Sequence, residues 1–278
     1  MKISILSGKG GTGKTTLSVN LFAYLEKATL IDTDTEEPNS HIFIKPNNEI
    51  TIEVLKNHPV VDHDACTFCG LCGDHCNFNA IIPTKTKVLV FEDLCHDCGM
   101  CSLVCKSGAI TYREKQIGSI FTSTDQEKTF HYGKLNIGEV SGVRLIDKLN
   151  KITSNDDLII TDCPPGVSCS TVAALTNTDY AIICAEPTPF GISDMRMVVE
   201  LLREDSIPFG VVVNKSGIGN DDIYKYLEDE NIKLLENIPW TKQRAEIYSK
   251  GELIIDYDEI FRSKIKNILT QVMCENHG

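Results

Sequence analysis

The fold that this sequence predicts is decided by one stretch near its start, Gly8-Lys9-Gly10-Gly11-Thr12-Gly13-Lys14-Thr15. The stretch fits the pattern G-x-x-x-x-G-K-[ST], in which successive backbone N–H groups converge on phosphate oxygens. Apolar residues precede it at Ile3–Leu6, and Lys14–Leu25 repeats apolar residues at a helical spacing. A strand, a loop and a helix in this order direct the positive end of the helix at the phosphates. We therefore predict a nucleotide-binding loop.

Outward from this loop, short apolar segments alternate with segments of helical spacing. Strands are expected at Thr29–Ile31, Leu158–Thr161, Ala181–Ala185, Gly210–Val213 and Leu234–Ile238. Helices are expected at Val143–Ile152, from Ser168, at Ser193–Leu202, at Asp222–Leu227, around Ile247 and at Ile260–Met273. A hairpin is expected from Ile117–Phe121 and Lys128–Tyr132. The alternation predicts an α/β fold with a doubly wound, mostly parallel sheet.

This rhythm breaks between residues 59 and 113, where eight of the twelve cysteines lie. Two runs share the spacing C-x₂-C-x₂-C-x₃-C, namely Cys66, Cys69, Cys72 and Cys76, then Cys95, Cys98, Cys101 and Cys105. An offset of 29 residues relates the two runs, so the segment is an internal repeat. We predict an inserted module at 59–113 that interrupts a nucleotide-binding domain made of 1–58 and 114–278.

The cysteine spacing resembles that of bacterial two-cluster ferredoxins, in which the fourth cysteine of each run ligates the other run's cluster. The resemblance implies a ferredoxin-like α+β domain with two [4Fe–4S] clusters. Cluster one would use Cys66, Cys69, Cys72 and Cys105, and cluster two would use Cys95, Cys98, Cys101 and Cys76. Two structural zinc sites are the alternative, but zinc favours separated cysteine pairs over three cysteines within seven residues.

Charge and composition narrow the possible partners and the compartment. The net charge of −12 argues against nucleic acid, because phosphate binding needs clustered Lys and Arg. Met1-Lys2 leads straight into the first strand without a secretory leader, and no apolar run approaches the ~20 residues of a membrane-spanning helix. We expect a soluble cytoplasmic protein whose cysteines bind metal, since the cytosol keeps thiols reduced.

A second lysine in the loop, Lys9, makes it closely resemble the deviant Walker A loop of the MinD/ParA ATPases, a group that includes the nitrogenase iron protein. The resemblance implies hydrolysis of ATP with Mg²⁺, in a homodimer where Lys9 reaches the partner's nucleotide. The residues that it assigns to nucleotide binding are Gly8, Gly10, Gly11, Thr12, Gly13, Lys14, Thr15, Thr16 and Asn214.

Two acidic positions complete the implied site. Asp162 begins Asp-Cys-Pro-Pro-Gly and resembles the family's Walker B aspartate, which with Thr15 would hold Mg²⁺. Asp34 resembles the first-switch aspartate that positions the attacking water, although Asp32 fits the same short motif. Lys9, Lys14 and Asp34 are thereby assigned to catalysis. A helix N-cap or a turn is the structural alternative for either aspartate.

The remaining cysteines lie outside the module at Cys163, Cys169, Cys184 and Cys274, and buried structural thiols are the general expectation for them. Cys169 follows Asp162 by seven residues, a spacing that resembles a cluster ligand of the nitrogenase iron protein. A third, interfacial cluster is therefore a hypothesis. The apolar stripe of Ile260–Met273 is expected to close the domain rather than to bind a membrane.

Taken together, the chain resembles the MinD-superfamily P-loop ATPases that carry an inserted ferredoxin domain. This resemblance covers essentially the full chain and leaves two functions open. In the first, the nucleotide state controls electron transfer through both clusters to a partner protein, which fully ligated clusters favour. In the second, the protein assembles or delivers iron–sulfur or related metallocofactors, which kinship with cluster carriers favours. A positioning ATPase with structural clusters ranks last.

Overall fold

The structure is a computed structural model that describes residues 1–275. The chain forms two compact units. The first unit comprises Met1–Ile52, Ile120–Lys134 and the described residues from Gly142 onward, and the second comprises Glu53–Ser119 and Leu135–Ser141. The insert that the sequence predicts at 59–113 lies inside the second unit, which extends past it at both ends and takes in a further segment.

A large sheet organises the chain. Within the described residues, its nine strands have the order β11-β10-β9-β1-β8-β2-β7-β6-β3. From β11 to β7, neighbouring strands pair in parallel, which confirms the mostly parallel sheet. These strands are β1 (Lys2–Leu6), β2 (Ala28–Asp32), β7 (Lys128–Leu135), β8 (Ile159–Asp162), β9 (Tyr180–Ala185), β10 (Phe209–Ser216) and β11 (Leu234–Pro239).

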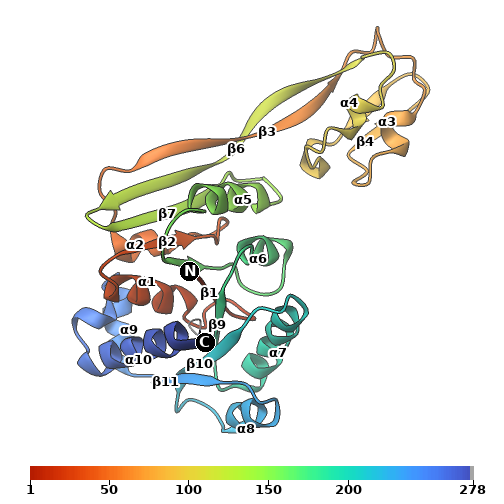
Figure 1. The fold of residues 1–278 in the computed structure, drawn as a ribbon. Coiled ribbons are helices and arrows are strands. Elements are labelled where there is room, and N and C mark those ends of the chain that lie inside the picture. Colours follow the sequence, from red (N-terminus) through yellow and green to blue (C-terminus); the bar gives the residue numbers. More distant parts are fainter. Residues whose placement is uncertain (276–278) are drawn as a thin grey trace. The chain divides into compact units, whose positions relative to one another are not determined.

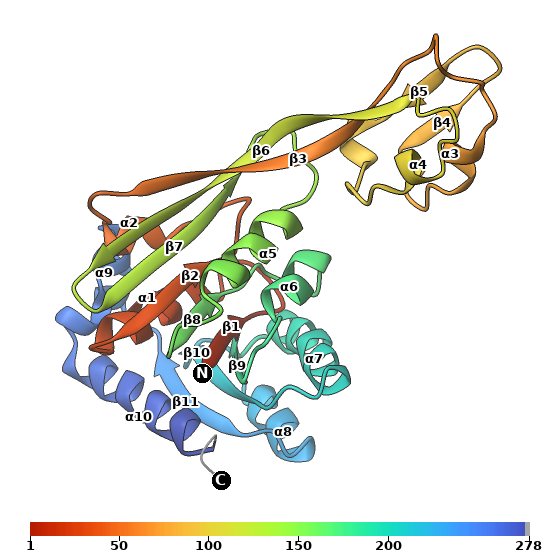
Figure 2. The ribbon, with the colours of Figure 1, turned by 45° about the horizontal axis from the view of Figure 1, so that its top comes forward.

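Helices cover both faces of this sheet in the first unit (Figures 1 and 2). One face packs against α1 (Lys14–Tyr24), α9 (Lys242–Ser249) and α10 (Glu259–Glu275). The other packs against α5 (Val143–Ile152), α6 (Cys169–Ala174), α7 (Pro189–Glu204) and α8 (Asp222–Asp229). The α/β class is therefore confirmed, with helices on both sides as a doubly wound fold requires.

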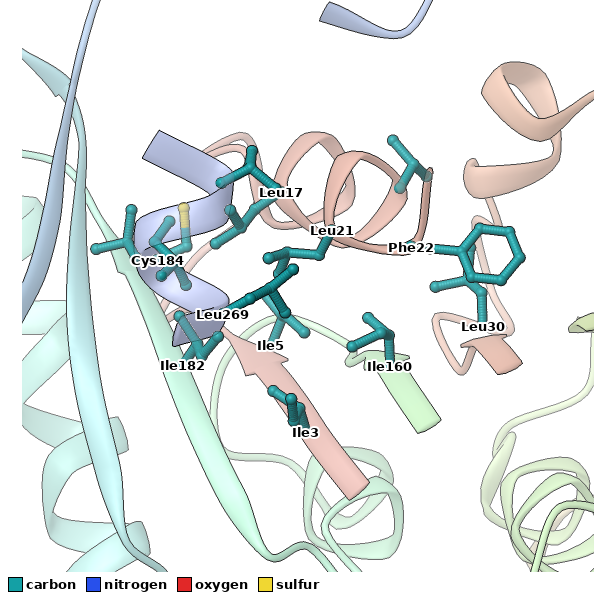
Figure 3. Packing of buried hydrophobic residues seen from close by; sticks show 14 of the residues in the cluster. Ile3, Ile5, Leu17, Leu21, Phe22, Leu30, Ile160, Ile182, Cys184 and Leu269 are labelled. Atoms are coloured by element: carbon teal, nitrogen blue, oxygen red, sulfur yellow. The ribbon is translucent and has the colours of Figure 1, made fainter. Parts of the chain in front are cut away.

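The alternating side-chain directions of the buried strands produce this arrangement. Ile182 lies in the cluster under α1 and α10, and its neighbour Ile183 lies in the cluster under α7. Figure 3 shows the first cluster, where Leu17 and Leu21 of α1 gather over Ile5 of β1. Burying each such side chain contributes about 1.5–3 kcal/mol, so the end of β1, from which the glycine loop departs, is firmly held.

Several elements differ from the sequence prediction, and three of them lie at or near the edges of the sheet or begin a helix earlier. Helix α7 begins at Pro189 rather than Ser193, because Thr188 caps it by accepting a hydrogen bond from Gly191 N (3.0 Å) and Pro suits the first turn. Strand β3 (Ile50–Val61) was not expected, since Lys56 and Pro59 interrupt its apolar residues. It is the last strand in the sheet order, where Pro is tolerated. Strand β6 (Ile110–Asp125) is longer than the predicted hairpin arm.

The second unit contains the cysteine runs on short elements. These are α3 (Leu71–Asp74), β4 (Ile81–Pro83), β5 (Val88–Val90), the 3₁₀ turn η1 (Glu92–Leu94) and α4 (Met100–Leu103). Strands β4 and β5 pair antiparallel. The buried apolar residues Ile81, Val88 and Ile110 form a small core, against which several cysteines pack half-buried. Helices α3 and α4 lie 29 residues apart, so the sequence repeat is also a structural repeat.

Candidate functional site

The glycine loop connects β1 to α1, as the sequence predicted. Two of its glycines are required by close neighbours. A Cβ on Gly13, whose φ is +100°, would lie 2.2 Å from Asn214 Nδ2, and a Cβ on Gly8 would lie 2.2 Å from the Asp194 carbonyl oxygen. Larger residues would displace both contacts, so the loop conformation depends on glycine at these positions.

A cavity of about 500 Å³ lies over this loop. Most of the predicted nucleotide-binding residues line it, namely Gly10, Gly11, Gly13, Lys14, Thr15, Thr16 and Asn214, together with Asp34. Thr12 does not line it, because its side chain is buried, with 2% of its surface exposed. The Thr12 carbonyl oxygen instead accepts hydrogen bonds from Asn214 Nδ2 (2.7 Å) and Cys184 Sγ (3.3 Å), which tie the loop to β9 and β10.

Asp162 lies at the end of β8, next to the loop. Thr15 Oγ1 donates a 2.6 Å hydrogen bond to Asp162 Oδ2, and Ser18 Oγ donates one of 3.1 Å to Oδ1. Strands β1 and β8 are parallel neighbours, so their carboxyl ends bring these residues together. Burial raises the pKa of Asp162, and the nearby Lys14 ammonium opposes that shift. A hydroxyl and a carboxylate in contact beside a phosphate loop form a donor set that suits Mg²⁺.

The structure separates the two aspartates that the sequence could not distinguish. Asp32 is fully buried, and its Oδ2 accepts hydrogen bonds from Asn39 N (3.0 Å) and Ser40 N (2.9 Å) at the start of α2 (Ser40–Ile44). Burial, reinforced by Asp162, raises its pKa to about 7. Asp34 instead lines the cavity, and burial raises its pKa to about 6 while Lys14 opposes the shift. Asp34 is therefore the one of the two that can reach a ligand.

Lys9 is held within its own chain. Its Nζ lies 3.2 Å from Glu186 Oε2, while Lys215 Nζ donates to Glu186 Oε1 (2.5 Å) and to the Gly11 carbonyl oxygen (2.9 Å). The two ammonium groups hold the pKa of Glu186 below its usual value, against the effect of burial. Glu186 thus pairs with two lysines at the edge of the loop.

Other residues lining the cavity were not identified from the sequence. Most of them come from the end of β11 and the chain after it, and they include Pro239, Trp240, Thr241, Arg244 and Tyr248. Arg244 is fixed by Asp258 Oδ2 (2.7 Å from Nε) and by the Pro239 carbonyl oxygen (2.8 Å from Nη1). An apolar, aromatic wall suits a flat base. A Pro-Trp pair directly after an apolar strand was the available signal, since strand ends are where ligands bind in such sheets.

The eight clustered cysteines line two separate cavities in the second unit. The first is lined by Cys66, Cys69, Cys72 and Cys105, and the second by Cys76, Cys95, Cys98 and Cys101. Each cavity thus takes three cysteines from one run and the fourth from the other. In residues 1–275, no three His, Cys, Asp or Glu side chains are arranged around a single metal-ion position.

The repeat brings the same backbone geometry to both cavities. Phe68 and Asp97, 29 residues apart, both have positive φ, and their N–H groups donate to Cys66 Sγ and Cys95 Sγ at 3.4 Å. Gly70 and Gly99 also have positive φ and precede α3 and α4. Non-glycine residues avoid this conformation unless the surroundings impose it. The loops are therefore shaped so that backbone N–H groups approach the sulfurs.

Of the four cysteines outside the second unit, two match the expectation of buried thiols and two do not. Cys163 and Cys184 are buried, and burial raises the pKa of each thiol to about 12. Cys169, at the start of α6, and Cys274 are exposed. The apolar stripe of α10 is buried in the core at Phe261, Ile265, Ile268, Leu269 and Val272, so this helix closes the domain. No helix among residues 1–275 is long and apolar enough to cross a membrane.

The sequence of this chain is similar to a described protein family and to several known proteins. Residues 3–254 match the family described as the CobQ/CobB/MinD/ParA nucleotide binding domain. The chain is 31% identical to the uncharacterized protein MJ0579 of Methanocaldococcus jannaschii over 98% of each chain. It is 26% identical to an iron–sulfur cluster carrier protein of Pyrococcus furiosus, covering 93% of this chain and 80% of that one.

A solved structure has a similar fold. The septum site-determining protein MinD of Pyrococcus horikoshii, complexed with Mg-ADP, matches with a TM-score of 0.59. The match covers 96% of this chain and 93% of that one at 21% identity. The similarity shows that the nucleotide-binding unit described above has a MinD-like fold.

Proposed function

This chain belongs to the CobQ/CobB/MinD/ParA nucleotide-binding family, and we propose that it is a Mg²⁺-dependent ATPase whose second unit carries two [4Fe–4S] clusters. We propose further that its nucleotide state controls electron transfer through those clusters to a partner protein. The observation that carries this proposal is that the eight cysteines line two cavities in the sets that two clusters need.

ATP hydrolysis is supported by the residues around the 500 Å³ cavity. Water attacks the γ-phosphorus, a P–O bond forms, and the bond to the β–γ bridging oxygen breaks, so that ADP and phosphate result. Lys14 and the loop N–H groups stabilise the phosphate charge. Thr15 and Asp162 would hold Mg²⁺, which neutralises that charge when bound. Asp34, with a pKa of about 6, is ionised at neutral pH and can accept a hydrogen bond from the water.

The two cysteine sets fit [4Fe–4S] clusters better than single ions. In a [4Fe–4S] cluster each cysteine thiolate binds a different iron. The four cysteine sulfurs therefore surround the cluster and do not converge on a single metal position. Four cysteines around a cavity, with backbone N–H groups directed at sulfurs, meet that requirement. Cys66, Cys69, Cys72 and Cys105 would hold cluster one, and the other four would hold cluster two. When bound, the clusters would supply one-electron redox chemistry.

A homodimer is part of this proposal. The Lys9 side chain is 36% exposed and lies at the edge of the loop, and its ammonium pairs only with Glu186 among the ion pairs of residues 1–275. By resemblance to the deviant Walker A loop, Lys9 would leave Glu186 and reach the nucleotide of a second copy. An Asp34→Ala variant that binds but does not hydrolyse ATP should dimerise with Mg-ATP in light scattering, and the Lys9→Ala, Asp34→Ala double variant should not.

Electron transfer requires a one-electron donor of low potential and an acceptor protein. The donor would lose one electron and the acceptor would gain it, with the cluster-binding cysteines holding the group through which the electron passes. The decisive experiment is an anaerobic EPR titration of the reconstituted protein with and without Mg-ATP. We expect about eight irons per chain and a nucleotide-dependent shift in at least one midpoint potential. Unshifted potentials would contradict coupling, and absence of cubane signals would contradict the clusters.

Cofactor delivery is the second candidate, and the 26% identity to an iron–sulfur cluster carrier protein favours it. A carrier must release its cluster to an acceptor, whereas an electron carrier must retain it. Incubation with an apo-ferredoxin and Mg-ATP separates the two functions. Transfer of iron and sulfide to the acceptor would support delivery, and retention of both clusters over repeated ATP turnover would support electron transfer.

A further inference from the structure

Two of the eight clustered cysteine sulfurs lie within hydrogen-bonding distance of a side-chain hydroxyl in the described part of the chain. Tyr112 Oη lies 3.4 Å from Cys101 Sγ, and Ser107 Oγ lies 3.6 Å from Cys105 Sγ. Tyr112 lines the second cysteine cavity and Ser107 lines the first. In each cavity, therefore, one of the four cysteine sulfurs has a side-chain hydroxyl within hydrogen-bonding distance.

These hydroxyls depart from the internal repeat. The residue 29 positions before Tyr112 is Pro83, and the residue 29 positions before Ser107 is Phe78. Pro83 lines the first cavity and Phe78 lines the second, at the equivalent places, but neither side chain can donate a hydrogen bond. The repeat brings equivalent N–H groups to both cavities, whereas the hydroxyls come from different positions and different residue types. The two cavities are thus made chemically unequal.

The direction of these hydrogen bonds follows from the chemistry of a ligating sulfur. A thiolate bound to iron has no proton and can only accept. A phenol keeps its proton at neutral pH, because its usual pKa is about 10, so Tyr112 must be the donor. Reduction adds negative charge to the cluster and its sulfurs. A hydroxyl that donates to a sulfur therefore stabilises the reduced form more than the oxidised form.

We propose that Tyr112 raises the reduction potential of cluster two by donating a hydrogen bond to Cys101, and that Ser107 does the same for cluster one through Cys105. This inference rests on the proposed pair of clusters. Tyr112 and Ser107 are positioning residues, because they act on the clusters through their ligands. Unequal hydroxyl donors give the two clusters different potentials, which directs an electron from the lower to the higher one.

Ser102 competes for the proton of Tyr112. Tyr112 Oη lies 3.1 Å from Ser102 Oγ, and Ser102 Oγ in turn donates to the Gly99 carbonyl oxygen (3.1 Å). A phenol has one proton, so Tyr112 donates either to Ser102 or to Cys101 at any moment. Removing the Ser102 hydroxyl leaves the sulfur as the acceptor. The Ser102→Ala variant should therefore move the potential of cluster two in the direction opposite to that of Tyr112→Phe.

The test compares four full-length proteins, reconstituted anaerobically and titrated by EPR: wild type, Tyr112→Phe, Ser107→Ala and Ser102→Ala. In Tyr112→Phe, the ratio of reduced to oxidised cluster two at fixed poise should fall by about tenfold, equal to about 59 mV for one electron. The potential of cluster one should not change. Ser107→Ala should lower the potential of cluster one alone, so the two variants together assign each EPR signal to its cluster. Ser102→Ala should raise the potential of cluster two, which Tyr112→Phe lowers.

The outcomes separate this inference from the proposed function. A wild-type protein without two cubane signals would overturn the clusters and the inference together. Two clusters whose potentials are unchanged in Tyr112→Phe, or shifted equally, would overturn the inference alone. If Tyr112→Phe does not retain eight irons, Ser102→Ala decides, and an unchanged or lowered potential of cluster two in that variant would refute the inference.

Discussion

The nucleotide site at the glycine loop and the cluster sites proposed for the second unit, here called the cysteine unit, are built in opposite ways. The nucleotide site gathers Lys14, Asp34, Asp162 and Trp240 from distant parts of the chain, over an extensive core. The cysteine unit gathers its eight cysteines from 40 consecutive residues around a core of three buried apolar side chains. The half-buried cysteines are themselves part of that small core.

The difference in core size indicates how each site is stabilised. A sheet with helices on both faces buries enough apolar surface to hold a ligand site without its ligand. A small unit with a minimal core usually needs a metal or a cross-link in addition, and metal binding then becomes part of its folding energy. We therefore expect the nucleotide site to persist empty and the cysteine unit to depend on its clusters. The predictions below test this contrast, from the largest effect to the smallest.

Loss of the clusters should unfold the second unit and spare the first. In a Cys98→Ser variant, or after iron chelation, amides between residues 66 and 110 should lose nearly all protection from hydrogen exchange. Amides of β1, β8 and β9 should keep theirs, because their core is independent of iron. Exchange read by mass spectrometry measures both. Cys274→Ser, at an exposed cysteine outside the unit, is the control. If the amides between residues 66 and 110 kept full protection without iron, the cysteine unit would not depend on clusters for its folding.

Removal of the loop lysine should weaken ATP binding without affecting iron. Lys14 lines the cavity and contributes a charge-assisted contact worth about 1.5–3 kcal/mol, so Lys14→Ala should bind ATP about 10- to 100-fold more weakly in calorimetry. Its iron content should equal that of the wild type. Lys151→Ala, at an exposed helix end, is the matched control for loss of one positive charge. A parallel loss of iron would mean that the two sites are not independent.

Acid should switch off hydrolysis through Asp34. Burial raises its pKa to about 6, so the carboxylate is mostly ionised at pH 7 and mostly protonated at pH 5. A protonated Asp34 cannot accept the hydrogen bond that orients water. The value of kcat/KM, which reports the free enzyme, should fall about tenfold between these pH values. Glu204→Gln, at an exposed position at the end of α7, should keep the profile. A flat profile would remove Asp34 from this role.

Trp240 should make the smallest contribution. It is the single tryptophan of the chain and lines the nucleotide cavity with 49% of its surface exposed. Its fluorescence should therefore change on ATP binding and should remain native after iron chelation. A half-exposed aromatic contact is worth about 0.5–1.5 kcal/mol, so Trp240→Ala should weaken ATP binding by about two- to tenfold. Tyr257→Ala, an exposed aromatic outside the cavity, should not.

Much of this protein could be predicted from local spacing. The glycine loop, the alternation of strands with helices and the 29-residue cysteine repeat each depend on residues close together in sequence. Their geometry is governed by the backbone itself, through 3.6 residues per helical turn, positive φ at glycine and the reach of a short loop. The α/β fold and the position of the phosphate site were therefore predictable, and the two cysteine cavities have the composition that the repeat implied.

What the tertiary structure alone decided depends on residues that are distant in sequence. Asp32 and Asp34 are equivalent in a short motif. Only the folded chain brings backbone N–H groups at the start of α2 to Asp32 and leaves Asp34 in the cavity. Likewise, Glu186 meets Lys9 and Lys215 because parallel strands end at one edge of the sheet. Burial, hydrogen-bond partners and charge neighbours are properties of the folded chain, so spacing cannot supply them.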